Sequence, residues 1–234
     1  MPTADDYRTA FNLERRNVYP VVDAFEAASG YALDRAKLEA AARVLACPVK
    51  KNPPCWAHGR ILYSATRMRL HGIAGPVNLF EIGSAKGFGA LCLLWARQDA
   101  NHQGPVTSVD VIDPDDWVSR NTVAELDHPL TLRETLAPWP ESVLVDFQQS
   151  TGIDYLEAHD ERIHVAFVDG KHSGPVVEKE GWLLSHRQQH GDVALFDDVH
   201  IPAVNRAVEG LSSVYDFQRF DLLPQRALML GVRK

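Results

Sequence analysis

A short apolar run that leads through a glycine-rich turn into a second apolar run sets the tightest limit on the fold. Val77–Ile82 has the composition of a buried strand, and Ala90–Ala96 that of a helix. Between them, Gly83, Gly87 and Gly89 let the backbone turn sharply and approach a ligand where a Cβ would clash. The free N–H groups of the helix then point at whatever lies in the loop. The stretch predicts the opening of a βαβ unit.

The spacing of these glycines narrows the ligand. No Gly-Lys-Ser/Thr closes the loop, and the glycines do not follow the G-x-G-x-x-G spacing of dinucleotide-binding loops. With Glu81 the stretch reads Glu-x-Gly-x-x-x-Gly-x-Gly, which resembles motif I of class I S-adenosylmethionine-dependent methyltransferases. A carboxylate suits a ligand that carries an ammonium, a sulfonium and ribose hydroxyls, whereas it repels a diphosphate. A glycine turn that merely joins strand to helix is the alternative. The resemblance implies that the cofactor S-adenosylmethionine is bound by Glu81, Gly83, Ser84, Gly87 and Gly89.

Size and charge exclude several classes of protein. The 234 residues suffice for one α/β domain with a sizeable core. The formal net charge of -7 argues against a nucleic-acid groove, which needs a basic face. Cys47, Cys55 and Cys92 lack zinc-ligand spacing and predict no disulfide framework. With neither an apolar leader at the N-terminus nor a run long enough to cross a bilayer, we expect a cytoplasmic protein without a membrane partner.

Residues 5–72 have the pattern of helices. Asp34 is an N-cap candidate for a helix over Arg35–Ala46, and a second helix is expected over Trp56–Leu70. Asn52–Cys55 between them is predicted to be a rigid turn. Helices that precede the first strand cannot join the alternation of the sheet. We therefore expect residues 1–72 to form a helical lid or cap segment, and residues 73–234 to form the α/β domain of methyltransferase type.

A second strand is expected over Val106–Ile112, which is rich in β-branched residues. Asp113 and the residues after it break the strand and predict a helix through Leu126. Asp110 lies near the carboxyl end of the strand, about twenty residues after the glycine loop, where an acid grips ribose hydroxyls in nucleotide-binding folds. A surface aspartate is the alternative for Asp110, and Asp113 is its local rival.

The next segment predicts a connection over residues 127–141, a third strand over Val143–Gln148 and a short helix over Ile153–His159. Ser150 and Thr151 stand between that strand and that helix. By resemblance to class I methyltransferases, these two residues contact the adenine of the cofactor. A simple helix N-cap is an equally good interpretation of them.

Two further strands end in carboxylates. The near-continuous apolar run Ile163–Val168 predicts a central parallel strand that ends at Asp169, and Val193–Phe196 predicts another that ends at Asp197 and Asp198. Open α/β sheets bind ligands outside the carboxyl ends of their strands. Acids gathered there repel one another, so a cation is their natural counterweight. Their hard oxygen atoms suit Mg²⁺, Mn²⁺ or Ca²⁺. The alternative is that these acids cap helices and pair with lysine.

The residues around these strand ends carry a second resemblance. Val-Asp-Gly-Lys-His at 168–172 and Gly-Asp-Val-Ala-Leu-Phe-Asp-Asp-Val-His-Ile-Pro-Ala-Val at 191–204 resemble metal-dependent small-molecule O-methyltransferases. The likeness is to the macrolide- and aminocoumarin-sugar branch and, more distantly, to the catechol type. It implies that Asp169, Asp197 and Asp198 hold the metal, that Asp169 also borders the cofactor, and that His172 is the base.

Two departures from the resemblance bear on the acceptor. The catechol type has Asp-Asn where this chain has Asp197-Asp198, which favours a sugar-like acceptor over a catechol. Many relatives carry an aromatic residue two places after the histidine, where this chain has Gly174-Pro175 after Ser173. The substrate wall is therefore undefined by the sequence.

The implied chemistry is an in-line displacement of a methyl group from a sulfonium. A coordinated metal lowers the pKa of an acceptor hydroxyl, and the imidazole of His172 titrates near neutrality, so it can take the proton. Lys171 is the second choice as the base, because its pKa would need a large downward shift. His200 is a weaker candidate that orients a metal ligand.

The C-terminal third completes the expected fold. A long helix is predicted over Val176–Gln189 and another that begins at Ile201. Ser213–Phe220 and Arg226–Val232 alternate as two strands around Pro224. We therefore predict a Rossmann-like, seven-stranded, mostly parallel sheet that finishes in an antiparallel hairpin, as class I methyltransferases do.

The leading hypothesis is a metal-dependent O-methyltransferase that acts on a small hydroxylated molecule, such as a sugar moiety or a natural product. A nicotinamide oxidoreductase is the rival enzyme, but its glycine spacing is absent. Two further hypotheses are a metal-independent methyltransferase and a non-catalytic module that binds S-adenosylmethionine. The sequence names neither the acceptor nor the oligomeric state, and it is compatible with a homo-oligomer.

Overall fold

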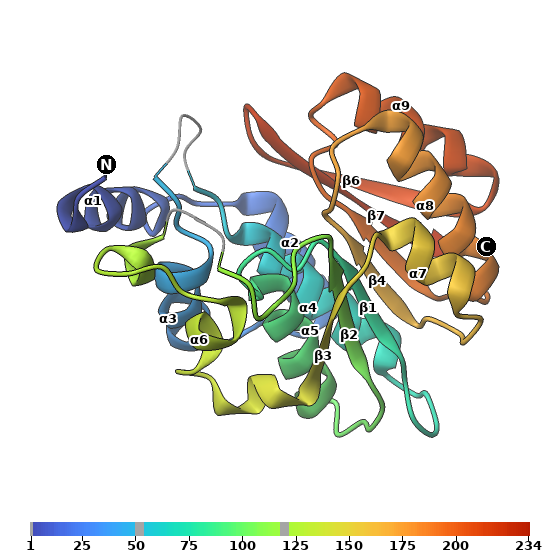
Figure 1. Ribbon diagram of the computed structural model, residues 1–234. Helices are drawn as coiled ribbons and strands as arrows, with labels where there is room; N and C mark the ends of the chain where they lie inside the picture. The colour runs from blue at the N-terminus through green and yellow to red at the C-terminus, as the bar shows by residue number, and fades with distance from the viewer. Residues whose placement is uncertain (1, 50–53, 118–121) are drawn as a thin grey trace.

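The computed structural model describes residues 2–49, 54–117 and 122–234. Within these residues the strands form one seven-stranded sheet in the order β3-β2-β1-β4-β5-β7-β6 (Figure 1). The first five strands run parallel, and β7 pairs antiparallel with both β5 and β6. The predicted Rossmann-like sheet with a C-terminal hairpin is therefore confirmed. In chain order the strands are β1 (Leu79–Ile82), β2 (Val106–Asp110), β3 (Val145–Gln149), β4 (Val165–Val168), β5 (Val193–Phe196), β6 (Tyr215–Leu223) and β7 (Arg226–Arg233).

The register of the parallel strands brings their carboxyl ends to one edge. Ile82 at the end of β1 lies beside Val168 at the end of β4, which in turn lies beside Phe196 at the end of β5. Each of these three strands is four residues long and buried throughout, as expected of strands that are covered on both faces. Asp169 and Asp197, which directly follow β4 and β5, therefore leave the sheet side by side.

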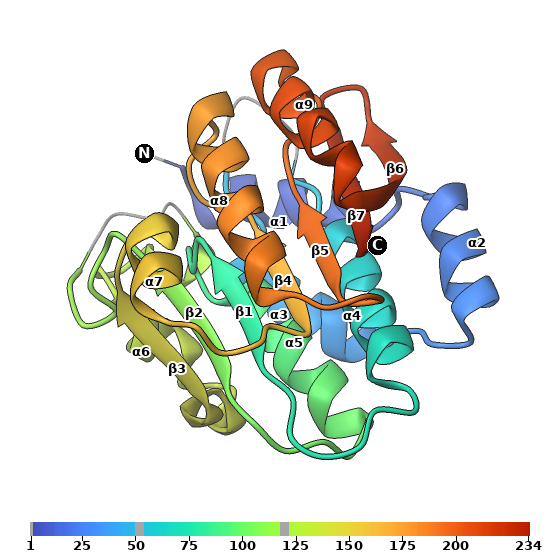
Figure 2. The same ribbon diagram turned by 90° about the vertical axis from the view of Figure 1, so that its right-hand side faces the viewer.

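Successive strand residues point to opposite faces, so the sheet separates two hydrophobic clusters. Leu79 and Phe167 belong to the cluster on the side of α4 (Ala57–Leu70) and α5 (Phe88–Asp99). Phe80 and Ala166 belong to the cluster on the opposite face. Figure 2 shows the helices of that face in front of the sheet. They are α7 (Gly152–Ala158), α8 (Gly174–Arg187) and α9 (Pro202–Glu209), and the 3-10 helix η3 (Gly210–Ser213) follows α9.

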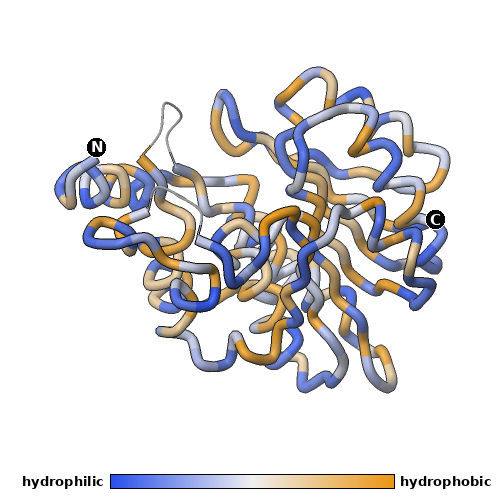
Figure 3. The backbone as a smooth tube through the Cα atoms, viewed as in Figure 1, coloured by the Kyte–Doolittle hydropathy of each residue, from blue (hydrophilic) through white to orange (hydrophobic). Residues whose placement is uncertain are grey.

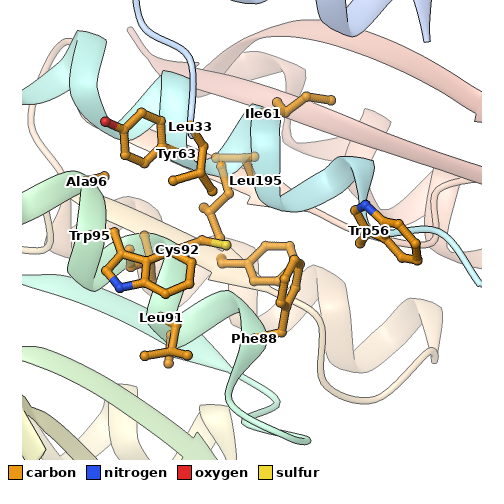
Figure 4. Packing of buried hydrophobic residues seen from close by; sticks show 14 of the residues in the cluster. Leu33, Trp56, Ile61, Tyr63, Phe88, Leu91, Cys92, Trp95, Ala96 and Leu195 are labelled. Carbon is orange, nitrogen blue, oxygen red and sulfur yellow. The ribbon is translucent and has the colours of Figure 1, made fainter. Parts of the chain in front are cut away.

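The helices α4 and α5 pack closely against each other. A Cβ on Gly59 of α4 would lie 2.7 Å from Cε1 of Phe88 and 2.9 Å from Sγ of Cys92, so only glycine allows this approach. Figure 4 shows Phe88, Cys92 and Trp95 of α5 in this cluster, with Tyr63 of α4 nearby. The indole N–H of the buried Trp95 donates to Glu141 at 2.9 Å. Figure 3 shows hydrophobic residues concentrated along the strands and in the interior.

The N-terminal segment is helical, as predicted. Its helices are α1 (Ala4–Glu14), α2 (Pro20–Ser29), α3 (Arg35–Leu45) and then α4. Asp34 caps α3 by accepting from the N–H of Lys37 at 2.8 Å, which confirms the predicted N-cap. The buried carboxylate of Glu14 accepts from the Tyr19 hydroxyl at 2.7 Å and from the Trp56 N–H at 3.3 Å. These bonds tie α1 to the start of α4. The division of the chain at residue 72, and a lid role for the segment before it, stay predictions.

The segment after β2 differs from the expectation. The helix predicted from Asp113 to Leu126 is wrong for its described residues, which form turns and the 3-10 helix η1 (Val123–Glu125). Trp117 and Leu126 are exposed there, so these two apolar side chains do not stabilise a longer helix by packing against the core. The predicted connection over residues 127–141 contains a short helix, α6 (Leu132–Leu136), and leads into η2 (Pro140–Leu144).

The predicted turn Asn52–Cys55 falls partly outside the described residues, which omit Asn52 and Pro53. Among the helices that the structure describes, none combines the length and the apolar character needed to cross a bilayer.

Candidate active site

The glycine loop between β1 and α5 is shaped by two close approaches. Gly83 has a φ of +98°, and a Cβ there would collide with the backbone carbonyl of Asp169. A Cβ on Gly89, near the start of α5, would collide with the carboxylate of Glu81. Gly87 also has a positive φ and faces the side chain of Leu136. The motif glycines thus allow the loop to pack against the end of β4 and over its own strand.

Glu81 is enclosed beneath this loop. Only 1% of the residue is exposed, and its carboxyl accepts a hydrogen bond from the hydroxyl of Ser108 on β2. Ser84 is also buried, with its Oγ 2.7 Å from Oγ of Ser108. Burial raises the pKa of Glu81 to about 8, against the opposing hydrogen bond from Ser108. The side chain is therefore held between the sheet and α5, and its predicted contact with the cofactor stays a prediction.

A cavity of about 1020 Å³ lies outside the carboxyl ends of the strands. Asp110 lies in its wall and accepts hydrogen bonds from the N–H groups of Ala85 and Ile112, both at 3.1 Å. Thr151 also lines the cavity and caps α7 by accepting from the N–H of Asp154 at 3.0 Å. The cavity thus brings together these predicted cofactor-binding residues: Gly83, Asp110, Ser150, Thr151 and Asp169.

A smaller neighbouring cavity of about 140 Å³ is lined partly by the N-terminal segment. Leu45 and Pro48 border both cavities, whereas Cys55 and His58 border only the smaller one. His58 stacks on Phe167 with ring centroids 5.9 Å apart, and burial lowers its pKa, so its imidazole is neutral at pH 7. No sequence signal pointed to His58, because a lone histidine inside an apolar helix is usually a packing residue. Glu81, Ser84 and Gly89 also line this cavity.

The acidic edge holds a compact cluster that differs from the predicted one. Ligand atoms of Asp169, His172 and Asp198 all lie within 4.8 Å of one another, and this is the group with metal-binding geometry among the described residues. Asp197 is not part of it. Its Oδ1 accepts from the N–H of Asp198 at 2.8 Å. Asp198 has a φ of +55°, and this left-handed turn directs its side chain to the cavity.

Hydrogen bonds and charges set the protonation of this cluster. Nδ1 of His172 lies 3.0 Å from Oδ2 of Asp198. Burial alone would raise the pKa of Asp198, but the hydrogen bond from His172 and then the charge of Arg226 lower it to about 2. The same bond raises the pKa of His172 above its ordinary value. Burial, followed by repulsion from Asp197 and Asp198, raises the pKa of Asp169 well above its ordinary value.

Arg226 supplies a cation that sequence reasoning missed. Its Nη1 donates to Oδ1 of Asp198 at 2.9 Å, and its Nη2 lies 3.7 Å from Oδ2 of Asp197. Arg226 begins β7, and the register pairs Met229 with Phe196 at the end of β5. The first residue of an antiparallel strand next to β5 necessarily lies at the edge where β5 ends. The signal was therefore present in the predicted hairpin.

The remaining predicted residues surround this cluster. Lys171 is exposed and lines the large cavity. Nδ1 of His200 lies 3.5 Å from Oδ1 of Asp198. In the glycine loop, the buried Lys86 lines the large cavity and forms an ion pair with Glu125 of η1.

The donor atoms fit a hard divalent cation. Asp169, Asp197 and Asp198 present three carboxylates against one guanidinium, and Oδ2 of Asp197 is buried without a hydrogen-bond partner among the described residues. Carboxylate oxygens with one imidazole nitrogen are ligands that Mg²⁺ and Mn²⁺ accept. Asp169 and Asp198 would hold such an ion, and His172 would act either as a third ligand or as a base beside it.

Known proteins of solved structure share this fold. A search of curated protein sequences found no match. The O-methyltransferase TomG from Streptomyces achromogenes, solved in complex with SAM, is 18% identical with a TM-score of 0.61, covering 94% of this chain and 98% of TomG. The cofactor-bound Rv0187 from MTB is 16% identical with a TM-score of 0.60, covering 93% of this chain and 98% of that one.

The O-methyltransferase from Bacillus cereus, in complex with SAH, is 14% identical with a TM-score of 0.57, covering 91% of this chain and 100% of that one. At these identities the likeness shows a common fold. A family model described as a methyltransferase domain matches residues 80–199, more than half of the chain, from β1 to the carboxylates after β5. The chain therefore belongs to this family of methyltransferases, and it has the class I fold.

Proposed function

We propose that this protein transfers a methyl group from S-adenosylmethionine to a hydroxyl oxygen of a small molecule, with the help of a divalent cation. The observation that carries the proposal is the pair of His172 and Asp198, 3.0 Å apart, beside Asp169 on the wall of the cavity that also reaches Asp110. Asp110, His172 and the carboxylates of Asp169 and Asp198 thus border one space of about 1020 Å³, which supports the proposed roles in holding the ribose, accepting the proton and binding the ion.

His172 is suited to accept the proton of the acceptor. When Nδ1–H donates to Asp198, Nε2 keeps its lone pair and half of the side chain stays exposed. The acceptor oxygen forms a bond to the methyl carbon, the bond from that carbon to sulfur breaks, and its electron pair neutralises the sulfonium. The hydroxyl proton goes to Nε2 of His172. A bound divalent cation supplies Lewis-acid stabilisation of the developing alkoxide.

The N-terminal segment supports the choice of a small acceptor. Leu45 and Pro48 of this segment border both cavities, so the segment contributes apolar residues rather than a basic surface to their walls. The net charge of -7 also disfavours a polyanionic acceptor. Both observations favour a hydroxylated small molecule, such as a sugar moiety or a natural product.

Arg226 supports a second candidate, a metal-independent methyltransferase. Its guanidinium already neutralises part of the cluster, with contacts to Asp197 and Asp198. In this form of the proposal, Arg226 and His172 together stabilise the acceptor oxygen without an ion.

One experiment separates these candidates. Purified protein is incubated with S-adenosylmethionine and with panels of sugars, hydroxylated polyketides and catechols. The release of S-adenosylhomocysteine is measured in the presence of Mg²⁺ and in the presence of EDTA. We expect turnover that EDTA abolishes and Mg²⁺ or Mn²⁺ restores. EDTA-resistant turnover selects the metal-independent candidate. Tight NAD(P) binding in calorimetry, without binding of S-adenosylhomocysteine, would overturn both in favour of an oxidoreductase.

A further inference from the structure

An acid in the wall of the large cavity has one buried oxygen without a hydrogen bond among the residues that the structure describes. Glu180 of α8 is 3% exposed, and its Oε2 has no hydrogen-bond partner among the described residues. Two buried acids of the N-terminal segment are partnered instead: Glu14 by Tyr19, and Glu26 by Arg60. A buried carboxyl oxygen without a hydrogen bond costs free energy, and contact with a ligand would explain its presence here. Glu180 is therefore a candidate for contact with a ligand.

Its position within the cavity identifies which part of a ligand it meets. A Cβ on Gly152 would lie 2.6 Å from Oε1 of Glu180, so this oxygen is directly beside the first residue of α7. Gly152 follows Ser150, whose N–H donates to the carbonyl of Asp110 at 2.8 Å. Glu180 therefore lies in the cavity wall beside the start of α7, next to the loop after β3, which this hydrogen bond joins to the end of β2.

This inference rests on the proposed function, in which Asp110 binds the ribose hydroxyls of the methyl donor and Asp169 borders its sulfonium. In that orientation the adenine would extend toward the loop that contains Ser150 and Gly152. We propose that Glu180 recognises the 6-amino edge of the adenine of S-adenosylmethionine and so sets the specificity of this pocket for the donor.

The chemistry of the two groups is complementary. The 6-amino group of adenine is a donor beside a ring nitrogen that is an acceptor. A neutral carboxylic acid offers one acceptor and one donor in the same arrangement. Burial raises the pKa of Glu180 to about 7, so the neutral acid is well populated at neutral pH. Glu180→Gln preserves both a donor and an acceptor, whereas Glu180→Leu removes both.

The test compares S-adenosylhomocysteine with its purine analogue that lacks the 6-amino group, by isothermal titration calorimetry. In the wild type we expect S-adenosylhomocysteine to bind about 10-fold more tightly than the analogue, the effect of roughly one buried hydrogen bond. In Glu180→Leu the preference should fall to about 1-fold, because S-adenosylhomocysteine loses two hydrogen bonds whereas the analogue loses only the bond to its ring nitrogen. Glu180→Gln should keep the preference, and so should Glu178→Leu, which changes an exposed residue of the same helix.

The melting temperature of the ligand-free protein excludes a structural explanation. Leucine removes an unpaired buried acid, so Glu180→Leu should match or exceed the wild type in melting temperature. An unchanged preference in Glu180→Leu would overturn the role of Glu180 and leave the proposed function intact. If Glu180→Leu fails to fold, the wild type alone gives the test. Equal affinity of the wild type for S-adenosylhomocysteine and for the purine analogue would then overturn the role of Glu180. Absence of any S-adenosylhomocysteine binding by the wild type would refute the proposed function itself.

Discussion

Nη1 of Arg226 donates a hydrogen bond to Oδ1 of Asp198 over 2.9 Å, and this contact connects the last strand of the sheet to the carboxylate cluster. Asp198 is 6% exposed and also receives the hydrogen bond from His172. The charge of Asp198 is therefore balanced by Arg226, which lies 28 positions later in the sequence. Removal of the Arg226 guanidinium leaves the buried carboxylates of Asp197 and Asp198 without the positive charge that balances them.

We predict that Arg226→Met lowers the stability of the metal-free protein by roughly 3 kcal/mol, because breaking a buried pair leaves an uncompensated charge. Addition of Mg²⁺ or Mn²⁺ should raise the melting temperature of the variant more than that of the wild type, since the ion replaces the lost positive charge. Differential scanning fluorimetry with and without each ion checks this.

Arg133→Met is the matched control for this prediction. Arg133 forms an exposed pair with Asp115, and such surface pairs contribute little to stability. The control should change the melting temperature only slightly and should not alter its response to metal. Equal responses to Mg²⁺ in Arg226→Met and the wild type would contradict a cation site at this cluster.

The strands were predictable because each carries its own signal. The run Val193–Phe196 is apolar throughout and bounded by Asp192 and Asp197, and the structure has β5 over the same four residues. Parallel packing then dictates that Asp169 and Asp197 share an edge. The segment from Asp113 to Leu126 carried no such signal. Asp113 and the acids after it are typical of a helix start, which favoured a helix. The sequence has no periodic apolar face here, so its pattern does not distinguish a helix from turns.

The chemistry of the site was less predictable than its location. Which carboxylate faces the cavity depends on a single backbone angle, the φ of +55° at Asp198, and aspartate has only a modest tendency toward that region. The carboxyl of Glu81 is held against the hydroxyl of Ser108, a contact that the spacing of the glycine motif does not specify. Such outcomes depend on side-chain directions that spacing along the chain does not encode.

The histidine–aspartate pair predicts a pH dependence. The hydrogen bond to Asp198 raises the pKa of His172 above its ordinary value of 6.5. Protonated His172 cannot accept the acceptor's proton, so kcat/KM should rise as pH increases through that raised pKa and then level off. His172→Gln should lower kcat about 10²-fold and remove this limb of the profile.

His186→Gln, at an exposed position near the end of α8, serves as the control and should keep the wild-type profile. Profiles of kcat/KM between pH 5.5 and pH 9, in about half-unit steps, give the comparison. If Lys171→Gln removes the limb while His172→Gln keeps it, Lys171 is the base. A rate that falls as pH rises would exclude both.

The geometry of the cluster predicts unequal effects for the two neighbouring aspartates. Asp198→Asn should abolish measurable Mg²⁺ binding in calorimetry, because Asp198 belongs to the group within 4.8 Å. Asp197→Asn should weaken Mg²⁺ binding only about 10-fold, as expected of a residue that positions a ligand. Both variants should bind S-adenosylhomocysteine as the wild type does.

Asp146→Asn on the exposed side of β3 is the control and should leave Mg²⁺ binding unchanged. A stronger effect of Asp197→Asn than of Asp198→Asn would restore the arrangement predicted from sequence, with Asp197 as a direct ligand. Loss of S-adenosylhomocysteine affinity in either variant would mean that the cluster supports the donor rather than an ion.

Glu81 predicts a dependence of stability on pH. Burial raises the pKa of Glu81 from 4.5 to about 8, so the folded state holds this proton more tightly than the unfolded chain does. The stabilisation is fully present below pH 4.5 and is lost as pH rises through about 8. Glu81→Gln keeps the shape of the side chain and cannot ionise. The free energy of unfolding of this variant should therefore rise relative to that of the wild type as the pH increases from about 4.5 to about 8.

The gain between pH 5 and pH 9 should be about 4 kcal/mol. Urea unfolding of both proteins at intervals between pH 5 and pH 9 measures it, and the difference between them cancels every titration they share. Glu157→Gln, in an exposed pair with Lys179, should run parallel to the wild type. If the Glu81→Gln curve were also parallel, Glu81 would be ionised in the folded protein at neutral pH. It would then be the carboxylate that the glycine motif first suggested, available to a cationic ligand.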